Sequence, residues 1–278
     1  MGDLVVYERQ GAVGIVTLNR ADKLNALTTE MQSDLNAAFV AAADDSDARV
    51  IVLTGAGRAF CVGADMDKLT RLVEKRGKTY DIPRPGNPVP ALRALDAEPA
   101  TLVSYTLPLA MKKPVIAAIN GPCVGVGLVM ACCCDVRFMG AGAFFGSAFP
   151  QRGLVAEYGL AWLLPRLIGL GRASDILLSG RRVEADEALA IGLVNKVVAD
   201  AGLLAAAMAY AQEMAQTAAP SSTATIKRQL ARAATQSYGE ASGEAWDLLM
   251  QAIAGDDFQE GVASFLEKRP PDFAAPAG

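Results

Sequence analysis

Two short apolar runs, each followed by a glycine-rich turn, limit most strongly how this chain can fold. Residues 50–54 lead into the turn at 55–65, and residues 115–120 lead into the turn at 121–127. Both runs are apolar on both faces, which is typical of strands buried between two layers. The second turn leads into a predicted helix at 128–134 and a short strand at 136–138. Strand, glycine turn, helix and strand form an α/β repeat, so the sequence predicts an α/β fold.

The elements on either side extend this prediction. Residues 4–7 and 13–19 are rich in β-branched side chains and predict a hairpin around Gly11. Residues 28–43 have the apolar spacing of a helix, with Thr28 or Thr29 as its N-cap. After residue 160 the pattern predicts helices at 161–168, 184–190, 201–216, 221–234, 243–254 and 258–268. We therefore divide the chain into an α/β core at 1–200 and a helical C-terminal region at 201–278.

The segment from residue 70 to residue 112 differs from the rest of the core. It mixes acidic and basic residues with Pro83, Pro85, Pro88, Pro90 and Pro99. Proline fixes φ and removes a backbone donor, so a long regular element is excluded here. Long irregular segments in compact domains are often lids or binding loops. We expect a variable flap with one helical piece, and a disordered segment is the alternative.

The chain contains no histidine. This excludes Ser-His-Asp and Cys-His catalysis, metal sites with histidine ligands, and imidazole as a general base. Acid–base chemistry must then come from carboxylates, Lys, Tyr, Cys or backbone amides. Cys132, Cys133 and Cys134 are consecutive and face different directions on a helix, so we expect them in the core rather than around a metal ion. No metal site is predicted.

Composition also limits which cellular compartment and which kinds of binding partner can be expected. The formal net charge of −4 argues against a nucleic-acid-binding protein, which would carry a basic face. Five cysteines, three of them contiguous, do not form a disulfide framework, so a reducing cytoplasm is expected. The first residues lack a basic segment followed by an apolar one, so no signal peptide is expected. The longest apolar runs are too short to cross a membrane.

Both glycine turns are suited to present unpaired backbone amides. Gly63 lets a ligand approach the backbone because no Cβ is in the way. The turn at 125–127 comes at a helix N-terminus, where amides are unpaired and lie at the positive end of the helix dipole. Two such amides can converge on one oxygen and stabilise an oxyanion, which is worth about 3–4 kcal/mol in other enzymes. Each turn alone is also explained by the change of chain direction after a strand.

A set of motifs runs in order from one end of the chain to the other. The motifs are NR at 19–20, KLNAL at 23–27, GRAFCVGAD at 57–65, KPVIAAING at 113–121, GLVN at 192–195, EG at 260–261 and FLEKR at 265–269. Together they resemble the crotonase (enoyl-CoA hydratase/isomerase) superfamily over nearly the whole chain. The resemblance implies a spiral of ββα turns, a helical trimerisation region and an acyl-CoA thioester substrate.

The resemblance also implies roles for individual residues. The amides that hold the thioester oxyanion would be those of Ala64 and Val126, the latter at a position that is more often glycine. The CoA-binding residues would be Lys23, Ala26, Arg58 and Asp65, with Lys23 and Arg58 near the nucleotide and with Phe265 and Lys268 supplied by a neighbouring subunit. Solvated surface charges and a core aromatic are the alternative. Asp65 is also suited to brace the start of the next helix. Coenzyme A would enter as part of the substrate, without a permanently bound cofactor, and the assembly would be a homotrimer or a dimer of trimers.

The hydratases of this superfamily hold a water molecule with two glutamates, and this chain departs from that pattern. The matching positions are Val129 and Phe149, and neither side chain can orient or deprotonate water. With Trp162, they are expected to line the substrate pocket. Glu157 resembles the catalytic aspartate of related dienoyl-CoA isomerases and of a dehalogenase, and Phe149, Tyr158 and Trp162 would raise its pKa by excluding water. Glu157 is therefore the expected proton carrier, and a helix N-terminal residue favoured by the dipole is the alternative.

The favoured activity is proton transfer between two carbons of an acyl-CoA, as in double-bond isomerisation. One alternative is hydration of an enoyl-CoA, with Glu157 in place of the missing pair. Others are hydrolysis of a CoA thioester or of a C–C bond, and a crotonase-like scaffold without catalysis. The sequence leaves the acyl group and its length open.

Overall fold

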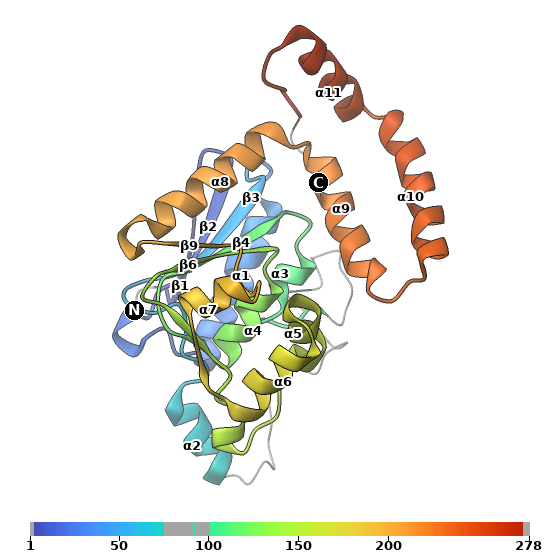
Figure 1. Cartoon of the computed structure of the whole chain (residues 1–278). Helices are drawn as coiled ribbons and strands as arrows, with labels where there is room; N and C mark the ends of the chain where they lie inside the picture. Colours follow the sequence, from blue (N-terminus) through green and yellow to red (C-terminus); the bar gives the residue numbers. More distant parts are fainter. Residues whose placement is uncertain (1–2, 75–91, 93–100, 275–278) are drawn as a thin grey trace.

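The computed structural model describes residues 3–74, 92 and 101–274, and its core is a six-stranded sheet (Figure 1). The strand order is β1-β2-β3-β4-β6-β9. β1 and β2 form the antiparallel hairpin predicted around Gly11, and every other neighbouring pair is parallel. The predicted α/β class is confirmed. The six strands are β1 (Val5–Gln10), β2 (Val13–Leu18), β3 (Val50–Gly55), β4 (Val115–Ile119), β6 (Val136–Gly140) and β9 (Lys196–Val198).

Helices cover both faces of this sheet, which is why its central strands are apolar on both sides. Leu53 belongs to the core cluster that contains α1 (Thr29–Asp44) and α4 (Val126–Cys133). Its neighbour Val52 points to the opposite face and belongs to the cluster that contains α8 (Leu203–Thr217). α8 lies across β2, β3 and β4. The predicted division at residue 200 groups α8 with the C-terminal helices, whereas the structure places it on the core sheet.

The observed helices lie close to the predicted ones. α1 begins after Thr28, whose Oγ accepts a hydrogen bond from the Met31 amide at 3.1 Å, as expected of its N-cap. α4 begins at Val126 rather than at residue 128, because Gly125 with φ +57 turns the chain directly into the helix. α6 is not predicted by the sequence pattern. The remaining helices of the core are α2 (Met66–Glu74), α3 (Leu107–Ala110), α5 (Leu160–Ile168), α6 (Leu170–Ser179) and α7 (Ala185–Ala190).

The predicted flap at 70–112 falls largely on residues 75–91 and 93–100, which lie outside the described part of the chain. Its two ends are described. The first belongs to α2 and the second contains α3.

A second, three-stranded sheet joins segments that the sequence does not show as strands. β5 (Cys123–Val124) is parallel to β7 (Phe144–Gly146), which is antiparallel to β8 (Arg182–Glu184). Strands of two or three residues are too short for a periodic pattern to reveal. The Gly125 amide donates to the Gly146 carbonyl at 2.9 Å, so the second glycine turn is fixed to the end of β7.

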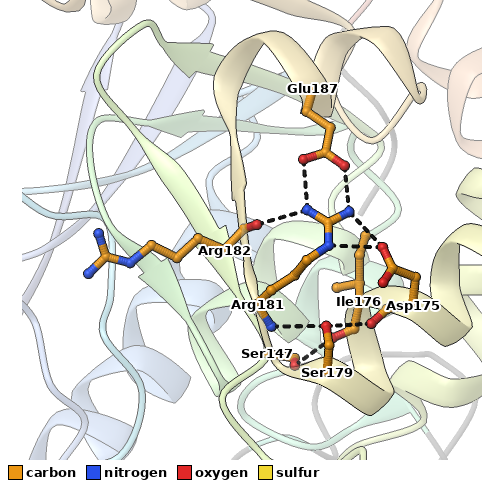
Figure 2. Close-up of polar contacts among 7 residues, drawn as sticks. All are labelled: Ser147, Asp175, Ile176, Ser179, Arg181, Arg182 and Glu187. Atoms are coloured by element: carbon orange, nitrogen blue, oxygen red, sulfur yellow. Dashed lines mark hydrogen bonds and ion pairs between the residues drawn. The ribbon is translucent and has the colours of Figure 1, made fainter.

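Polar contacts next to this sheet fix the residue that follows β7 (Figure 2). Ser147 Oγ donates to the carbonyl of Ile176 in α6 at 3.1 Å. Arg181 pairs with Asp175 on α6 at 2.7 Å and with Glu187 on α7 at 2.6 Å. One guanidinium therefore joins the two helices, and Ser147 is attached to the first of them.

The last three helices, α9 (Pro220–Ala233), α10 (Tyr238–Ile253) and α11 (Asp256–Glu267), extend away from the core (Figure 1). None of the described residues of α9 and α10 is buried. Their exposed side chains include large apolar ones, Leu230 and Trp246 among them. Within the described ranges, no helix is both long and apolar enough to cross a membrane.

Lys227 attaches α9 to the core. Its ammonium donates to the carbonyls of Pro108 at 2.8 Å and Lys113 at 3.2 Å, and it pairs with the Asp135 carboxylate at 2.7 Å. The same Asp135 oxygen accepts from the Val115 amide at 2.7 Å. Asp135 thus has a structural role at the start of β4.

Candidate active site

A cavity of about 480 Å³ lies between the two glycine turns, the loop after β2 and the loop before α5. Its walls come from residues 20–27, 62–69, 124–126 and 147–158, with Tyr105 beside them. Of the residues selected from the sequence, the cavity brings together Lys23, Ala26, Ala64, Asp65, Val126, Phe149 and Glu157. These residues are far apart in the sequence, so the cavity is the natural candidate for the active site.

The first turn presents the Ala64 amide at this cavity. Leu27 forms a parallel bridge with Ala64, in which Leu27 donates to the Gly63 carbonyl at 2.8 Å and accepts from the Asp65 amide at 3.1 Å. In such a ladder the middle residue directs its own N–H away from the partner strand. Within residues 3–74, 92 and 101–274, the Ala64 amide donates to no acceptor.

The second turn places Val126 at the first position of α4, where a helix leaves its amide unpaired. Gly63 has φ +95, and a Cβ added there would lie 3.2 Å from the Val124 carbonyl oxygen and 3.8 Å from the Val126 nitrogen. The backbone of the first turn therefore lies directly against the Val126 amide. The described residues offer that amide no acceptor, so two free N–H groups border one space.

Asn25 fixes the loop after β2 to the first turn. It is fully buried with φ +56, a left-handed conformation that asparagine tolerates better than most residues. Its side-chain oxygen accepts from the Arg20 amide at 2.8 Å. Its side-chain nitrogen donates to the carbonyls of Ala59 at 2.8 Å and Phe60 at 3.1 Å. Sequence reasoning gave Asn25 no role, because these partners become neighbours only in the folded chain.

Asp65 braces the start of α2. Its carboxylate pairs with Arg20 at 2.5 Å, and both side chains are largely buried. The other carboxylate oxygen accepts from the Asp67 amide at 2.9 Å. The hydrogen bond from Arg20 holds the pKa of Asp65 below its usual range, and the Asp67 amide acts in the same direction. Asp65 is therefore an ionised structural anchor beside Ala64.

Glu157 lies in the loop before α5, half-buried at the cavity wall. Burial raises the pKa of its carboxyl, and the positive charge of Lys68 opposes that rise. Tyr158 beside it packs edge-on against Tyr105, with ring centroids 5.1 Å apart. Tyr105 is itself buried and donates to Gln32 at 2.9 Å. The rings of Tyr105, Tyr158 and Phe149 thus line the cavity together with Glu157.

Five of the predicted site residues lie outside the cavity lining. Val129 is fully buried within α4. Trp162 is 45% exposed on α5, where Arg166 stacks on its ring at 3.8 Å. Arg58 is exposed on the first turn, and Phe265 and Lys268 are exposed at the end of α11. Within a single chain, these five residues do not line the cavity with Glu157.

The structure adds Lys68 to the site. This residue lies in the first turns of α2, half-buried in the cavity wall, and burial lowers the pKa of its ammonium while Glu30 and Glu157 oppose that change. The sequence contained one usable signal. Lys68 follows Ala64 by four residues, close enough in the sequence for its side chain to reach the same space as the turn at Ala64.

None of the five cysteines lines the cavity. All five are buried and free of disulfides. Burial raises the pKa of Cys61 to about 12 and that of Cys132 to about 11, so these thiols stay protonated. In the part of the chain that the structure describes, no cluster of three acidic or cysteine side chains could hold a metal ion.

Comparison with known proteins identifies a family to which this architecture is similar. The family model described as enoyl-CoA hydratase/isomerase matches residues 8–85 and 93–276. The "Probable enoyl-CoA hydratase echA12" of Mycobacterium leprae is 38% identical over 279 residues, which cover 96% of this chain and 89% of that protein. The "Short-chain-enoyl-CoA hydratase" of Clostridium acetobutylicum is 30% identical over 266 residues, covering 95% of each protein.

A solved structure extends the comparison to three dimensions. The crystal structure of an enoyl-CoA hydratase from Mycobacterium tuberculosis H37Rv matches with a TM-score of 0.85 at 25% identity, covering 99% of this chain and 100% of that chain. The predicted crotonase-type fold is confirmed by this match. The chain belongs to the enoyl-CoA hydratase/isomerase family, whose members are lyases and isomerases.

Proposed function

We propose that this enzyme moves a proton between two carbons of an unsaturated acyl-CoA thioester and so shifts its double bond. The observation that supports this most directly is the convergence of Ala64, Val126 and Glu157 on one cavity. Two free amides can hold an oxyanion, and one carboxylate with a raised pKa can both remove and return a proton.

In the proposed reaction, the thioester oxygen accepts hydrogen bonds from the Ala64 and Val126 amides. Ionised Glu157 removes a proton from the carbon next to the thioester, and the electron pair moves into a dienolate with its charge on that oxygen. The same carboxyl then returns the proton at the far end of the conjugated system. The double bond shifts by one carbon toward the thioester, and no atom is gained or lost.

The other carboxylates of the cavity are less suited to this role. Asp65 is held ionised by Arg20 and is fully engaged. Asp67 is exposed on the first turn of α2. Glu157 is the lining carboxylate, among those described, whose pKa is raised by burial, and a raised pKa makes a stronger base.

Hydration of an enoyl-CoA is the second candidate, and the names of the relatives favour it. It would require Glu157 to position water alone. Val129 is buried in α4, and Phe149 fills its part of the cavity wall with an apolar ring. These two residues favour isomerisation over a hydration that needs two glutamates.

We further propose that CoA enters as part of the substrate and binds near Lys23, Ala26, Arg58 and Asp65. Phe265 is 82% exposed at the end of α11, and Lys268 follows it. Their distance from the cavity in one chain suits a role in a neighbouring subunit. The exposed apolar faces of α9 and α10 support assembly as a homotrimer or a dimer of trimers. A cytoplasmic location and the absence of a permanently bound cofactor remain part of this proposal.

Glu157→Gln tests the proposed function. With 3-enoyl-CoA thioesters of several lengths, the native enzyme should produce the conjugated 2-enoyl isomer without adding the mass of water. The variant should lose turnover and bind acetyl-CoA as the native enzyme does in calorimetry. Undiminished isomerisation by the variant would remove Glu157 from the mechanism, whereas a product heavier by one water would favour the second candidate.

A further inference from the structure

We propose that Lys68 is a positioning residue that acts through Glu157: its ammonium supplies a positive charge in the same cavity and keeps the Glu157 carboxylate ionised before substrate binds. This inference rests on the proposed role of Glu157. It concerns how this chain arranges its charges once the usual glutamates are replaced by Val129 and Phe149.

The first support is the position of the two groups. Lys68 and Glu157 come from different walls of the same cavity, α2 and the loop before α5. Within the described ranges, neither side chain makes a hydrogen bond, and they form no salt bridge at 4.0 Å or less. The field of Lys68 therefore acts on Glu157 across the space between them rather than through a closed ion pair.

The second support is the local surroundings of each group. Lys68 is half-buried, and the groups that face it are the carboxylates Glu30, on α1, and Glu157. Around Glu157, the other charged residues of the cavity are Arg20, Lys23, Asp65, Asp67 and Arg152. Arg20 is paired with Asp65, and Arg152 is exposed and donates to the Ala148 carbonyl at 3.0 Å. Lys68 is the cation that counters the effect of burial on the pKa of Glu157.

The third support is the brace that holds the backbone around Lys68. The Leu69 amide donates to the Asp65 carbonyl at 3.1 Å, and the Asp67 amide donates to the Asp65 carboxylate at 2.9 Å. Asp65 is fixed in turn by Arg20. One short segment, residues 63–68, thus carries both a proposed oxyanion donor and the cation, and these hydrogen bonds hold its backbone.

Burial and Lys68 have opposite effects on the pKa of Glu157. Such a balance suits a base that must also return its proton. Burial alone favours the neutral acid, which cannot start the reaction. A positive charge in the same cavity opposes this effect and favours the carboxylate, without the direct ion pair that would make it a weak base. Removing the charge should therefore leave Glu157 protonated up to a higher pH.

The test compares Lys68→Met, Lys68→Arg and Arg71→Met. Arg71 is exposed on the same helix outside the cavity lining, so Arg71→Met removes one positive charge as a matched control. In Lys68→Met, the acidic limb of the kcat/KM profile should move to higher pH, with about a tenfold loss of rate on that limb for each unit of displacement. Lys68→Arg should keep the native profile because arginine retains the charge. Arg71→Met should also keep it, because the charge that it removes is exposed and lies outside the cavity lining.

A direct titration separates this inference from the proposed function. The infrared band of the protonated Glu157 carboxyl, assigned by its loss in Glu157→Gln, should persist to higher pH in Lys68→Met than in the native protein, and this readout needs no turnover. An unmoved band in Lys68→Met overturns the inference. Loss of activity in Lys68→Arg equal to that in Lys68→Met also overturns it, because the amine itself would then be needed. If Glu157→Gln stays active while the band moves, the proposed function fails and the electrostatic pairing stands.

Discussion

Gly63→Ala is the sharpest single test of the two-amide geometry, because Gly63 is where the two glycine turns meet. Its φ of +95 lies in the region that alanine avoids, and a Cβ would lie 3.2 Å from the Val124 carbonyl oxygen. That contact is a few tenths of an ångström too close, so the turn must move. The first atoms to move are those of Gly63 and of Ala64, whose amide is one of the proposed oxyanion donors.

The expected magnitudes follow from these two effects. The backbone conformation alone should lower the free energy of unfolding by about 1–3 kcal/mol. Misplacing one oxyanion donor should reduce kcat by about 10²- to 10³-fold, with a much smaller change in KM. The measurements are urea denaturation and steady-state kinetics with the acyl-CoA that the native enzyme converts.

Gly192→Ala is the matched control. Gly192 also has a positive φ, +79, but no atom lies within 4 Å of its added Cβ, and it lies outside the cavity lining. It should lose stability to a similar extent and keep its kcat. The reasoning is refuted if Gly63→Ala folds and keeps kcat within about twofold of the native value, since a displaced donor must cost transition-state stabilisation.

Two further predictions concern the supports of the site and its thiols. Arg20→Met should lower the free energy of unfolding by about 2 kcal/mol, because it leaves the Asp65 carboxylate largely buried without its partner. The pKa of Asp65 is depressed in the folded state, so its stabilising contribution is present above the unfolded pKa and is lost as pH falls through the folded value. Urea denaturation at several acidic pH values should show that this pH dependence of stability is weakened in Arg20→Met. An unchanged dependence would contradict the role of the pair. All five thiols are buried, and the pKa of Cys61 is raised to about 12. The native protein at pH 8 should therefore resist a thiol reagent until urea exposes the thiols. Fast labelling of the folded protein would show that this core opens readily.

Much of the α/β core could be predicted because its signals are local. The strands β3 and β4 are apolar on both faces, and glycines mark the turns that follow them. Thr28 caps α1 through contacts within one helical turn. β5, β7 and β8 could not be predicted, because each is held by its partner strand rather than by a pattern of its own.

The candidate site was predicted in part. Ala64, Val126 and Glu157 were identified from motifs, and the structure brings them to one cavity. Trp162 and Val129 were expected there, yet Trp162 faces away on α5 and Val129 lies inside α4. The direction of a side chain depends on how its helix is rotated against the core, and a motif does not specify that rotation.

The sequence by itself determined which chemistry is available. Without histidine, acid–base chemistry is left to carboxylates, Lys, Tyr, Cys or backbone amides. Tertiary structure decided which groups work together. It brought the Ala64 and Val126 amides to one cavity with no acceptor among the described residues, paired Asp65 with Arg20, and placed Lys68 and Glu157 in the same cavity lining. The physical reason is that composition limits the set of functional groups, whereas distance, burial and neighbouring charge set their reactivity, and these arise only when segments far apart in the chain pack against one another.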